Sequence, residues 1–243
     1  MMKVSGSVYL SAVMCSGLVL SGCRSSGPMT VSSSADFNRL SVLEDKVCSG
    51  ISNSYQCSLA MEKTQLSAVK GAVSREGARL RIKTSTGSVV ELRDSGVEGT
   101  DTQLTYQFAG FMPAIRQDLV HVQYFEGDAY LLVDPVTARQ TRLDAMPVSS
   151  PDKTRIATAS MDLEAQYNAN RVRVLKAMDG DWQMEYSTEP KSWGPSQPPV
   201  WLDNNTLRLV RCLKPCSGES HQTVPALLRR TPEGWVLTDE KRP

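Results

Sequence analysis

The sequence predicts an all-β fold, a meander of repeated hairpins that forms either a propeller-like stack or a β-sandwich, behind a signal peptide and a flexible tether. Three observations predict this class. Short runs alternate polar and apolar residues, Gly, Pro or Asp separates the runs, and a similar hairpin recurs near residues 79, 130, 171 and 226. A spacing of roughly 40–50 residues suits one four-stranded unit, and such a unit buries its apolar face only by stacking on a neighbour.

The first 22 residues have the pattern of a cleavable export signal. Lys3 is the single charged residue before an apolar run from Val8 to Leu20. That run has 13 residues, whereas a helix needs about 20 apolar residues to span the hydrocarbon core of a bilayer. A charged start, a short apolar run and small residues before the cut are typical of a secretory signal.

The run ends in Leu20-Ser21-Gly22-Cys23, which resembles the lipobox of bacterial lipoproteins. The resemblance implies cleavage before Cys23, a diacylglycerol on its sulfur and, usually, an acyl chain such as palmitate on the new amine. Two or three acyl chains hold a protein stably to a bilayer. Arg24 stands where Asp tends to retain enterobacterial-type lipoproteins in the inner membrane, so we expect an outer-membrane anchor and a periplasmic domain. The inner membrane and the cell surface stay open as alternatives.

We expect the tether over residues 23–36, a Ser-rich stretch, and the β-rich domain over residues 37–243. Removing 22 residues from 243 leaves 221, which allow four or five four-stranded units, near the minimum for a closed ring. The chain has 27 Lys and Arg against 26 Asp and Glu, and Lys3 leaves with the signal. The resulting balance of zero argues against nucleic acid as a partner.

Cysteine usage fits an exported protein. Of six cysteines, Cys15 leaves with the signal and Cys23 carries lipid. An even number remains for the oxidising periplasm, and we favour the local pairs Cys48–Cys57 and Cys212–Cys216 over the other connectivities. The alternative for the second pair is zinc held by Cys212, Cys216 and His221, but no fourth ligand lies nearby in the sequence. We therefore expect no metal and no cofactor.

The hairpins are predicted from alternation and turn residues. Arg79–Lys83 alternates, the chain turns near Gly87, and Val89–Leu92 returns. The other three hairpins turn at Asp134-Pro135, at Asp179-Gly180-Asp181 and at Pro232-Glu233-Gly234. Helices are expected only at Asp36–Val47 and Met161–Tyr167.

A second repeated element precedes two of the hairpins. Residues 147–159 and 199–210 each combine an apolar entry strand, a tight polar turn and an alternating return strand. The first copy, Ser150-Pro151-Asp152 followed by Ile156-Ala157, resembles the blade motif of TolB-like bacterial β-propellers. Lys153 stands where that family has Gly, and Asp203-Asn204-Asn205 replaces the motif in the second copy. The resemblance covers residues 130 to 240 and, weakly, 75 to 130, and it implies a propeller-like meander without naming an activity.

The sequence contains no recognisable catalytic set, so we predict that the protein is not an enzyme. His121 and His221 are the only histidines, and His121 lies in an alternating run where a histidine is most often an ordinary sheet residue. No Gly-x-Ser-x-Gly elbow and no phosphate loop occur. Asp162, Glu164, Asp179 and Asp181 are the remaining acidic candidates, but the spacing from Asp162 to Asn170 does not follow that of a calcium loop.

Two irregular segments, 161–170 and 189–199, stand out because the hairpin pattern does not require them. The first is acidic and rich in amides, and the second places Trp193 among prolines. Binding sites concentrate in loops on rigid scaffolds, and Trp and Tyr are enriched among binding anchors. We therefore predict a partner-binding surface at Glu164, Tyr167, Asn168 and Trp193, with a purely structural packing role as the alternative for Trp193.

These features favour a non-enzymatic, lipid-anchored module that binds a protein in the periplasm. The alternative is an immunity protein or inhibitor that neutralises a periplasm-acting toxin, such as a phospholipase or a cell-wall hydrolase. A hydrolase with an unrecognised site is a third hypothesis, which we do not favour.

Overall fold

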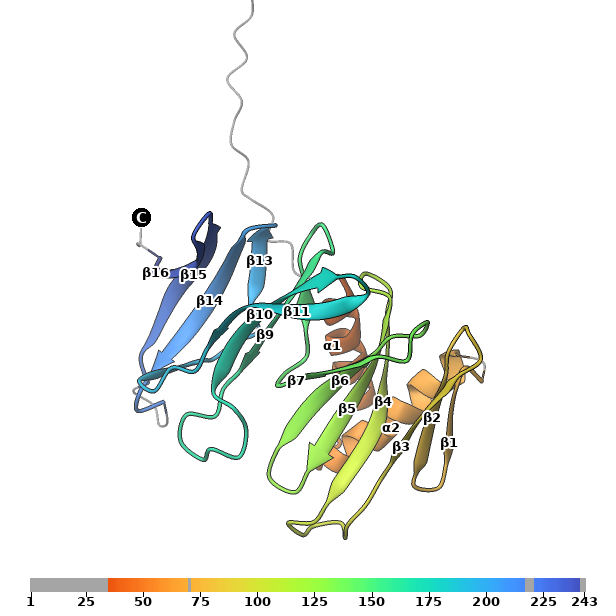
Figure 1. Cartoon of the computed structure of the whole chain (residues 1–243). Helices are drawn as coiled ribbons and strands as arrows, with labels where there is room; N and C mark the ends of the chain where they lie inside the picture. The colour runs from red at the N-terminus through yellow and green to blue at the C-terminus, as the bar shows by residue number, and fades with distance from the viewer. Residues whose placement is uncertain (1–34, 70, 217–220, 241–243) are drawn as a thin grey trace, which may run out of the picture. The chain divides into compact units, whose positions relative to one another are not determined.

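The computed structural model describes residues 35–69, 71–216 and 221–240, which form two helices followed by sixteen strands (Figure 1). The predicted signal peptide, Cys23 and the tether up to residue 34 lie outside the described residues. Strands dominate, and they form several antiparallel sheets, so the all-β prediction is confirmed at this level. Within the described ranges, neither helix is long and apolar enough to cross a membrane.

The elements follow one another as two helices and four sheets. The helices are α1 (Ala35–Val47) and α2 (Ser54–Ala68). The first sheet contains β1 (Val73–Glu76), β2 (Arg79–Lys83) and β3 (Val89–Arg93). The second contains β4 (Leu104–Met112), β5 (Gln117–Tyr124), β6 (Asp128–Val133) and β7 (Gln140–Leu143). The third contains β8 (Val148–Ser149), β9 (Arg155–Ser160), β10 (Arg171–Met178) and β11 (Asp181–Thr188). The fourth contains β12 (Trp193–Pro195), β13 (Val200–Asp203), β14 (Thr206–Leu213), β15 (Thr223–Thr231) and β16 (Gly234–Asp239).

Each sheet is an antiparallel meander of strands that are close in sequence. The orders are β1-β2-β3, β4-β5-β6-β7, β11-β10-β9-β8 and β12-β14-β15-β16, with β13 pairing with β14. All four predicted hairpins are present, as β2–β3, β6–β7, β10–β11 and β15–β16. The first shows why alternation predicts them: Leu80 opposes Leu92 and Ile82 opposes Val90, and these four apolar side chains are all buried on one face.

The core consists of three apolar clusters, each between successive sheets. The first combines side chains of β1–β3 with those of β4–β6, the second joins α1 and β4–β7 to β9 and β10, and the third joins β8–β10 to β13–β15. Alternation along β6 sends Leu131 and Val133 into the first cluster and Leu132 into the second. The second sheet therefore buries apolar residues on both faces, and Figure 1 shows the sheets following one another in chain order.

The two repeated entry elements form strand pairs, β8 with β9 and β13 with β14, as predicted. Their turns contact each other, because Asp152 N donates to Asn204 Oδ1 at 3.0 Å. Lys153 has a φ of 63°, in the left-handed region. Glycine adopts that region without strain, so Lys153 is a non-glycine residue in a backbone conformation that favours glycine.

Helix α1 confirms the predicted helix at Asp36–Val47 but corrects the tether boundary. It begins at Ala35, so Ala35 and Asp36 belong to the folded domain and not to the tether. Asp36 is buried, and its carboxylate accepts a hydrogen bond of 2.8 Å from Ala114 N. Arg39 donates through Nη2 to the Phe111 carbonyl at 2.6 Å. Polar contacts as well as Leu40 therefore fix this helix against the second sheet.

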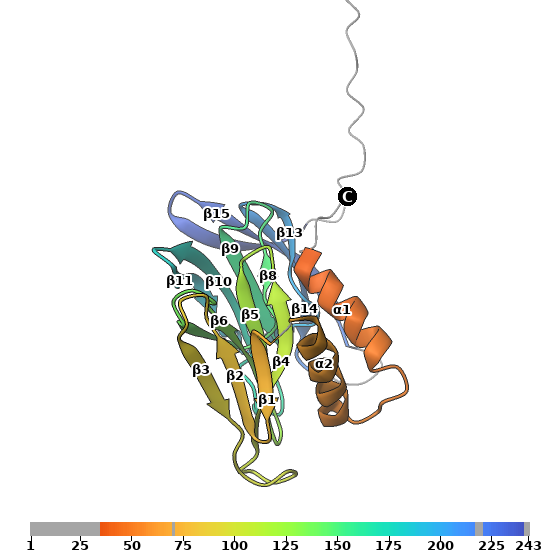
Figure 2. The same cartoon turned by 90° about the vertical axis from the view of Figure 1, so that its right-hand side faces the viewer.

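Helix α2 was not predicted, because its buried face is polar. The buried residues are Ser58, Glu62 and Gln65, which are spaced as one helical face but carry no apolar stripe. Asn53 caps the helix by accepting from Gln56 N at 2.9 Å. Both helices lie on the same side of the sheets, with α2 against β4 (Figure 2).

A buried carboxylate fixes α2 to an irregularity in β4. The pairing of β4 with β5 shifts register between Phe108 and Gly110, and such a bulge leaves a backbone group unpaired. Glu62 Oε1 accepts from Phe108 N at 2.9 Å and also from Arg75 Nη2 at 2.8 Å. Gly110, with a φ of 129°, allows the close approach, because a Cβ there would lie 2.9 Å from the Gln65 side chain.

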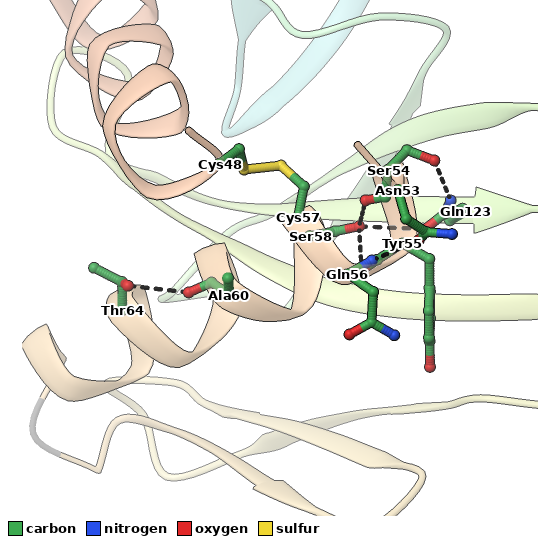
Figure 3. The surroundings of a disulfide bond; sticks show 10 residues. All are labelled: Cys48, Asn53, Ser54, Tyr55, Gln56, Cys57, Ser58, Ala60, Thr64 and Gln123. Carbon is green, nitrogen blue, oxygen red and sulfur yellow. Dashed lines mark hydrogen bonds between the residues drawn. A yellow bond between two sulfur atoms is a disulfide. The ribbon is translucent and has the colours of Figure 1, made fainter. Parts of the chain in front are cut away.

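Both favoured disulfides, Cys48–Cys57 and Cys212–Cys216, are present. Figure 3 shows that the first connects the end of α1 to the first turn of α2. In that turn Ser58 Oγ donates to the Ser54 carbonyl at 2.7 Å and to Gln123 Oε1 of β5 at 3.2 Å. The disulfide therefore joins α1 to α2, and α2 is itself hydrogen-bonded to the second sheet.

The helix predicted at Met161–Tyr167 is wrong. The segment is irregular, and Gln166 has a φ of 63°, outside the helical region. The Asp162 carboxylate accepts from Gln166 N and Asn168 N, both at 2.7 Å. Asp side chains compete with helical hydrogen bonding in this way, and here the local side-chain bonds replace the helix.

Candidate functional site

The two irregular segments singled out in the sequence contact each other in the structure. Asn170, at the end of the first, donates through Nδ2 to the carbonyl oxygens of Pro190 at 2.7 Å and Trp193 at 2.9 Å. Gly194 allows this contact, since a Cβ at that position would lie 2.7 Å from both Asn170 Oδ1 and Met161 Cγ. The segments 161–170 and 189–199 therefore form one surface.

The loop closed by Cys212–Cys216 joins this surface. Cys216 N donates to Glu164 Oε1 at 3.1 Å, and Lys214 N donates to the Ser192 carbonyl at 2.9 Å. The sulfur atoms of Cys216 and Met161 are 3.7 Å apart. Each irregular segment is thus bonded to the disulfide loop, and three loops from different parts of the chain meet.

Between these loops lies a cleft of about 320 Å³. We call it the loop cleft, and its lining includes Asp162, Asn168, Asn170, Arg171, Glu189, Lys191 and Lys214. The lining is therefore mostly polar and carries both signs of charge. Two buried atoms in it, Asn170 Oδ1 and Arg171 Nε, have no hydrogen-bond partner among the described residues.

The acidic groups of the loop cleft are bonded within the protein. Burial alone would raise the pKa of Asp162, but hydrogen bonds from the backbone N–H groups of residues 165–168 outweigh burial and lower it. Glu189 forms an ion pair of 2.5 Å with Arg171, which also pairs with Asp144 at 3.4 Å. Asp162 and Glu189 therefore form contacts that hold the loops together.

Two cations of the cleft have no such ion pair. The part of the chain that the structure describes contains no acidic partner within salt-bridge distance of Lys191 or Lys214, and both are exposed. They come from different loops, the proline-rich segment and the disulfide loop, and both line the cleft. The charged groups of this cleft that can pair with a partner are consequently the positive side chains of Lys191 and Lys214.

The four predicted partner-binding residues occupy different positions. Glu164 is exposed and holds the disulfide loop. Asn168 lines the cleft, and its Oδ1 accepts from Asp128 N at 3.0 Å, which fixes the segment to the start of β6.

The two aromatic residues of that set differ more sharply. Tyr167 has 60% of its surface exposed, and a hydrogen bond with Glu126 raises the pKa of its hydroxyl. Trp193 is half-buried in β12, packs against the third apolar cluster and lies under the Arg211 guanidinium, 5.6 Å from the ring centroid. The structure therefore gives Trp193 packing contacts and leaves Tyr167 as the accessible aromatic group.

The structure also shows where Cys212, Cys216 and His121 lie, which the sequence analysis considered for metal binding or catalysis. Cys212 and Cys216 are bonded to each other, so two ligands of the zinc alternative exist as a disulfide. Among the described residues, no group of three His, Cys, Asp or Glu side chains is arranged to hold a metal ion. His121 lies in β5, as predicted for a sheet residue, with its Nε2 3.0 Å from Asp128 Oδ2.

Comparison with protein-family models, curated proteins and solved structures finds no match to this chain.

Sequence reasoning missed the third member of the site and one further cavity. The segment 212–216 was noticed only for its cysteines, and its contact with residues 161–170 depends on packing between the third and fourth sheets. The cavity lies between the helices and the second sheet. One available signal was the polar composition of β4 and β5, where Gln107 and His121 stand at buried or half-buried positions.

Proposed function

We propose that this protein is a non-enzymatic, lipid-anchored envelope protein that binds a protein partner in the periplasm through the loop cleft. The observation that carries the proposal is the meeting of three separate loops around a cleft whose own acidic groups are already bonded. Rigid, internally bonded loops lose little conformational entropy on binding, which favours affinity. The lipid anchor on Cys23 remains part of the proposal, on the strength of the lipobox resemblance.

The charge of the cleft favours an acidic partner surface. Lys191 and Lys214 are exposed and have no ion pair with a described residue, so a partner carboxylate gains an interaction there without breaking one. Complementary charge increases association rates and specificity more than it increases raw affinity. Tyr167 adds an exposed aromatic group on the same segment as Asp162.

We also propose that the four sheets are successive blades of an incomplete propeller. Three features support this arrangement: the meander order of each sheet, the apolar clusters between successive sheets, and the left-handed residue at the position of the TolB-like glycine. On this proposal the loop cleft lies where two blades meet, which is a common location for binding sites.

Site-specific photo-crosslinking in living cells tests the binding proposal. A photoreactive amino acid at Gln166 or Ala169, which both line the cleft, is expected to give an adduct with one envelope protein, whereas the same group at exposed Val97 gives none. The double change Lys191→Glu and Lys214→Glu is expected to abolish the adduct made from position 166. Lys63→Glu is the matched control, because Lys63 is exposed on α2, away from the cleft. Adducts of equal yield from Val97 and the cleft positions would refute the proposal.

The anchor is tested separately by mass spectrometry of the purified protein. We expect cleavage before Cys23 and acyl chains on that residue, and we expect Cys23→Ser to release the protein from the membrane fraction. An intact, unacylated N-terminus on the wild-type protein contradicts the anchor.

A further inference from the structure

A second cavity, independent of the loop cleft, lies between the two helices and the second sheet. Its volume is about 210 Å³. We call it the helix-side cavity; Leu40, Met61 and Met146 form part of its apolar lining, and Glu44, Gln107, His121, Asp128 and Tyr130 form most of its polar lining. Sheet faces covered by helices usually carry apolar side chains, so these polar residues need an explanation.

The polar residues form a row across three strands. Gln107 of β4 opposes His121 of β5, and His121 opposes Tyr130 of β6. Directly opposed residues in antiparallel strands point to the same face, and Asp128 shares that face because it lies two residues before Tyr130. The His121 and Tyr130 rings have centroids 5.1 Å apart. The row is therefore a continuous polar surface facing the helices.

One member of the row has an unmet hydrogen bond. Gln107 is only 2% exposed, and its Nε2 donates to Thr105 Oγ1 at 3.1 Å. Its Oε1 is buried and has no donor among the described residues. Leaving a buried acceptor unpaired is unfavourable, and a ligand with an N–H group would satisfy it.

The other polar groups also favour a cation. The Asp128 carboxylate is paired with His121, whereas Glu44 of α1 forms no ion pair with another described residue. No Lys or Arg is among the lining residues. Burial and, after it, the charges of Asp128 and Glu44 raise the pKa of the Tyr130 hydroxyl, so both carboxylates act on the same phenol group. The cavity thus offers acceptors, negative charge and an aromatic side chain.

We propose that the helix-side cavity binds a small organic cation, a primary alkylammonium ion with a short apolar chain. Its N–H groups donate to Gln107 Oε1 and to the carboxylates of Glu44 and Asp128, and its methylene groups pack on Leu40, Met61 and the Tyr130 ring. Pockets for drug-sized ligands occupy about 300–1,000 Å³, so a cavity of 210 Å³ selects a short chain.

Calorimetric titration of the full-length protein near pH 7 tests this proposal with three probes of equal chain length. We expect n-butylammonium to bind at least about tenfold more tightly than n-butanol, and butyrate to give no binding. Gln107→Leu and Glu44→Gln are each expected to weaken n-butylammonium binding by about tenfold. Asp45→Asn is the matched control and keeps the wild-type affinity, because Asp45 is the next residue on α1 but does not line the cavity.

Chemical-shift mapping of the wild-type protein provides a measurement that needs no variant. On addition of n-butylammonium we expect changes at Gln107, His121 and Tyr130. Changes confined to other acidic surface groups would overturn the proposal. So would equal affinities for n-butylammonium and n-butanol, or wild-type affinity in a folded Gln107→Leu protein.

Discussion

Glu62 connects three parts of the fold through one carboxylate. It is 5% exposed and accepts from Phe108 N in the β4 bulge, while Arg75 donates to both of its oxygens, at 3.2 and 2.8 Å. Arg75 also pairs with Asp94 at 3.0 Å. Removing one partner of a buried ion pair leaves the other charge uncompensated, which destabilises far more than the loss of an exposed pair.

Glu62→Gln is therefore expected to lower the free energy of unfolding by about 3 kcal/mol, measured by urea denaturation. The retained Arg75–Asp94 pair keeps the loss from being larger. Glu91→Gln is the control, because the Arg81–Glu91 pair is exposed on both sides and contributes about 0–1 kcal/mol. Equal losses in the two variants would show that Glu62 has no special role.

Asp118 predicts a pH dependence of stability. Burial, followed by the charge of Asp134, raises the pKa of Asp118 from 3.8 to about 6. The folded state then binds a proton that the unfolded state releases, so this carboxyl lowers stability as the pH rises from about 4 to about 6. Below pH 4 both states are protonated and the effect is absent.

Asp118→Asn should remove this loss. Relative to the wild type, the variant is expected to gain up to about 3 kcal/mol in unfolding free energy between pH 4 and pH 7, at about 1.4 kcal/mol per unit of pKa shift. Unfolding curves at the two pH values measure the gain. A stability difference that stays constant across this range would contradict the raised pKa.

At the scale of elements, the prediction from sequence succeeded where one face of a strand is apolar. The hairpin β2–β3 alternates strictly, with Leu80, Ile82, Val90 and Leu92 buried, so its period is visible in the sequence. Helix α2 has no apolar residues repeating at helical spacing, because Ser58, Glu62 and Gln65 form its buried face. The helix prediction for residues 161–167 failed for the opposite reason. The composition of this segment suits a helix, but the Asp162 carboxylate accepts hydrogen bonds from the backbone of Gln166 and Asn168 and forms a turn.

The site was predictable to a similar extent. The segments 161–170 and 189–199 were visible because the hairpin pattern left them unexplained. Their contact with the loop at Cys212–Cys216 was not visible, since Cys216 N meets Glu164 across 52 residues of sequence. The helix-side row was hidden as well, because Gln107, His121 and Tyr130 become neighbours only through strand pairing.

The first disulfide yields a prediction about the helix pair. Cys48 and Cys57 are nine residues apart, and cross-linking a loop of this size stabilises by about 2–3 kcal/mol in the chain-entropy model. The double change Cys48→Ala and Cys57→Ala is expected to lower the unfolding free energy by that amount. Hydrogen exchange should accelerate more in α1 and in the first turn of α2 than in β14 and β15, which are affected only through the lower global stability. Uniform acceleration in all four sheets would refute a local role.

At the scale of the whole molecule, the three apolar clusters predict which core substitutions act independently. Phe108 belongs to the first cluster, and Trp201 and Leu207 belong to the third. Phe108→Ala and Trp201→Ala are each expected to cost about 3–5 kcal/mol. Substitutions that remove fewer side-chain atoms are better suited to a test of additivity, because the double variant must still fold.

Val120→Ala and Leu209→Ala provide that test, since they lie in the first and third clusters. Their effects on unfolding free energy should add to within about 0.5 kcal/mol, whereas Leu207→Ala and Leu209→Ala, in one cluster, should deviate from additivity by more. Chemical denaturation of the single and double variants measures both sums. Strong coupling between the separate clusters would contradict independent packing.

The meander order has a consequence for how such a chain changes over generations. Within the described residues, each sheet is made from one contiguous stretch of sequence. Duplication or deletion of one such stretch adds or removes a whole sheet and leaves the strand pairing of the others intact. Only the apolar faces at the junction must then adapt, so the architecture can grow or shrink by whole sheets.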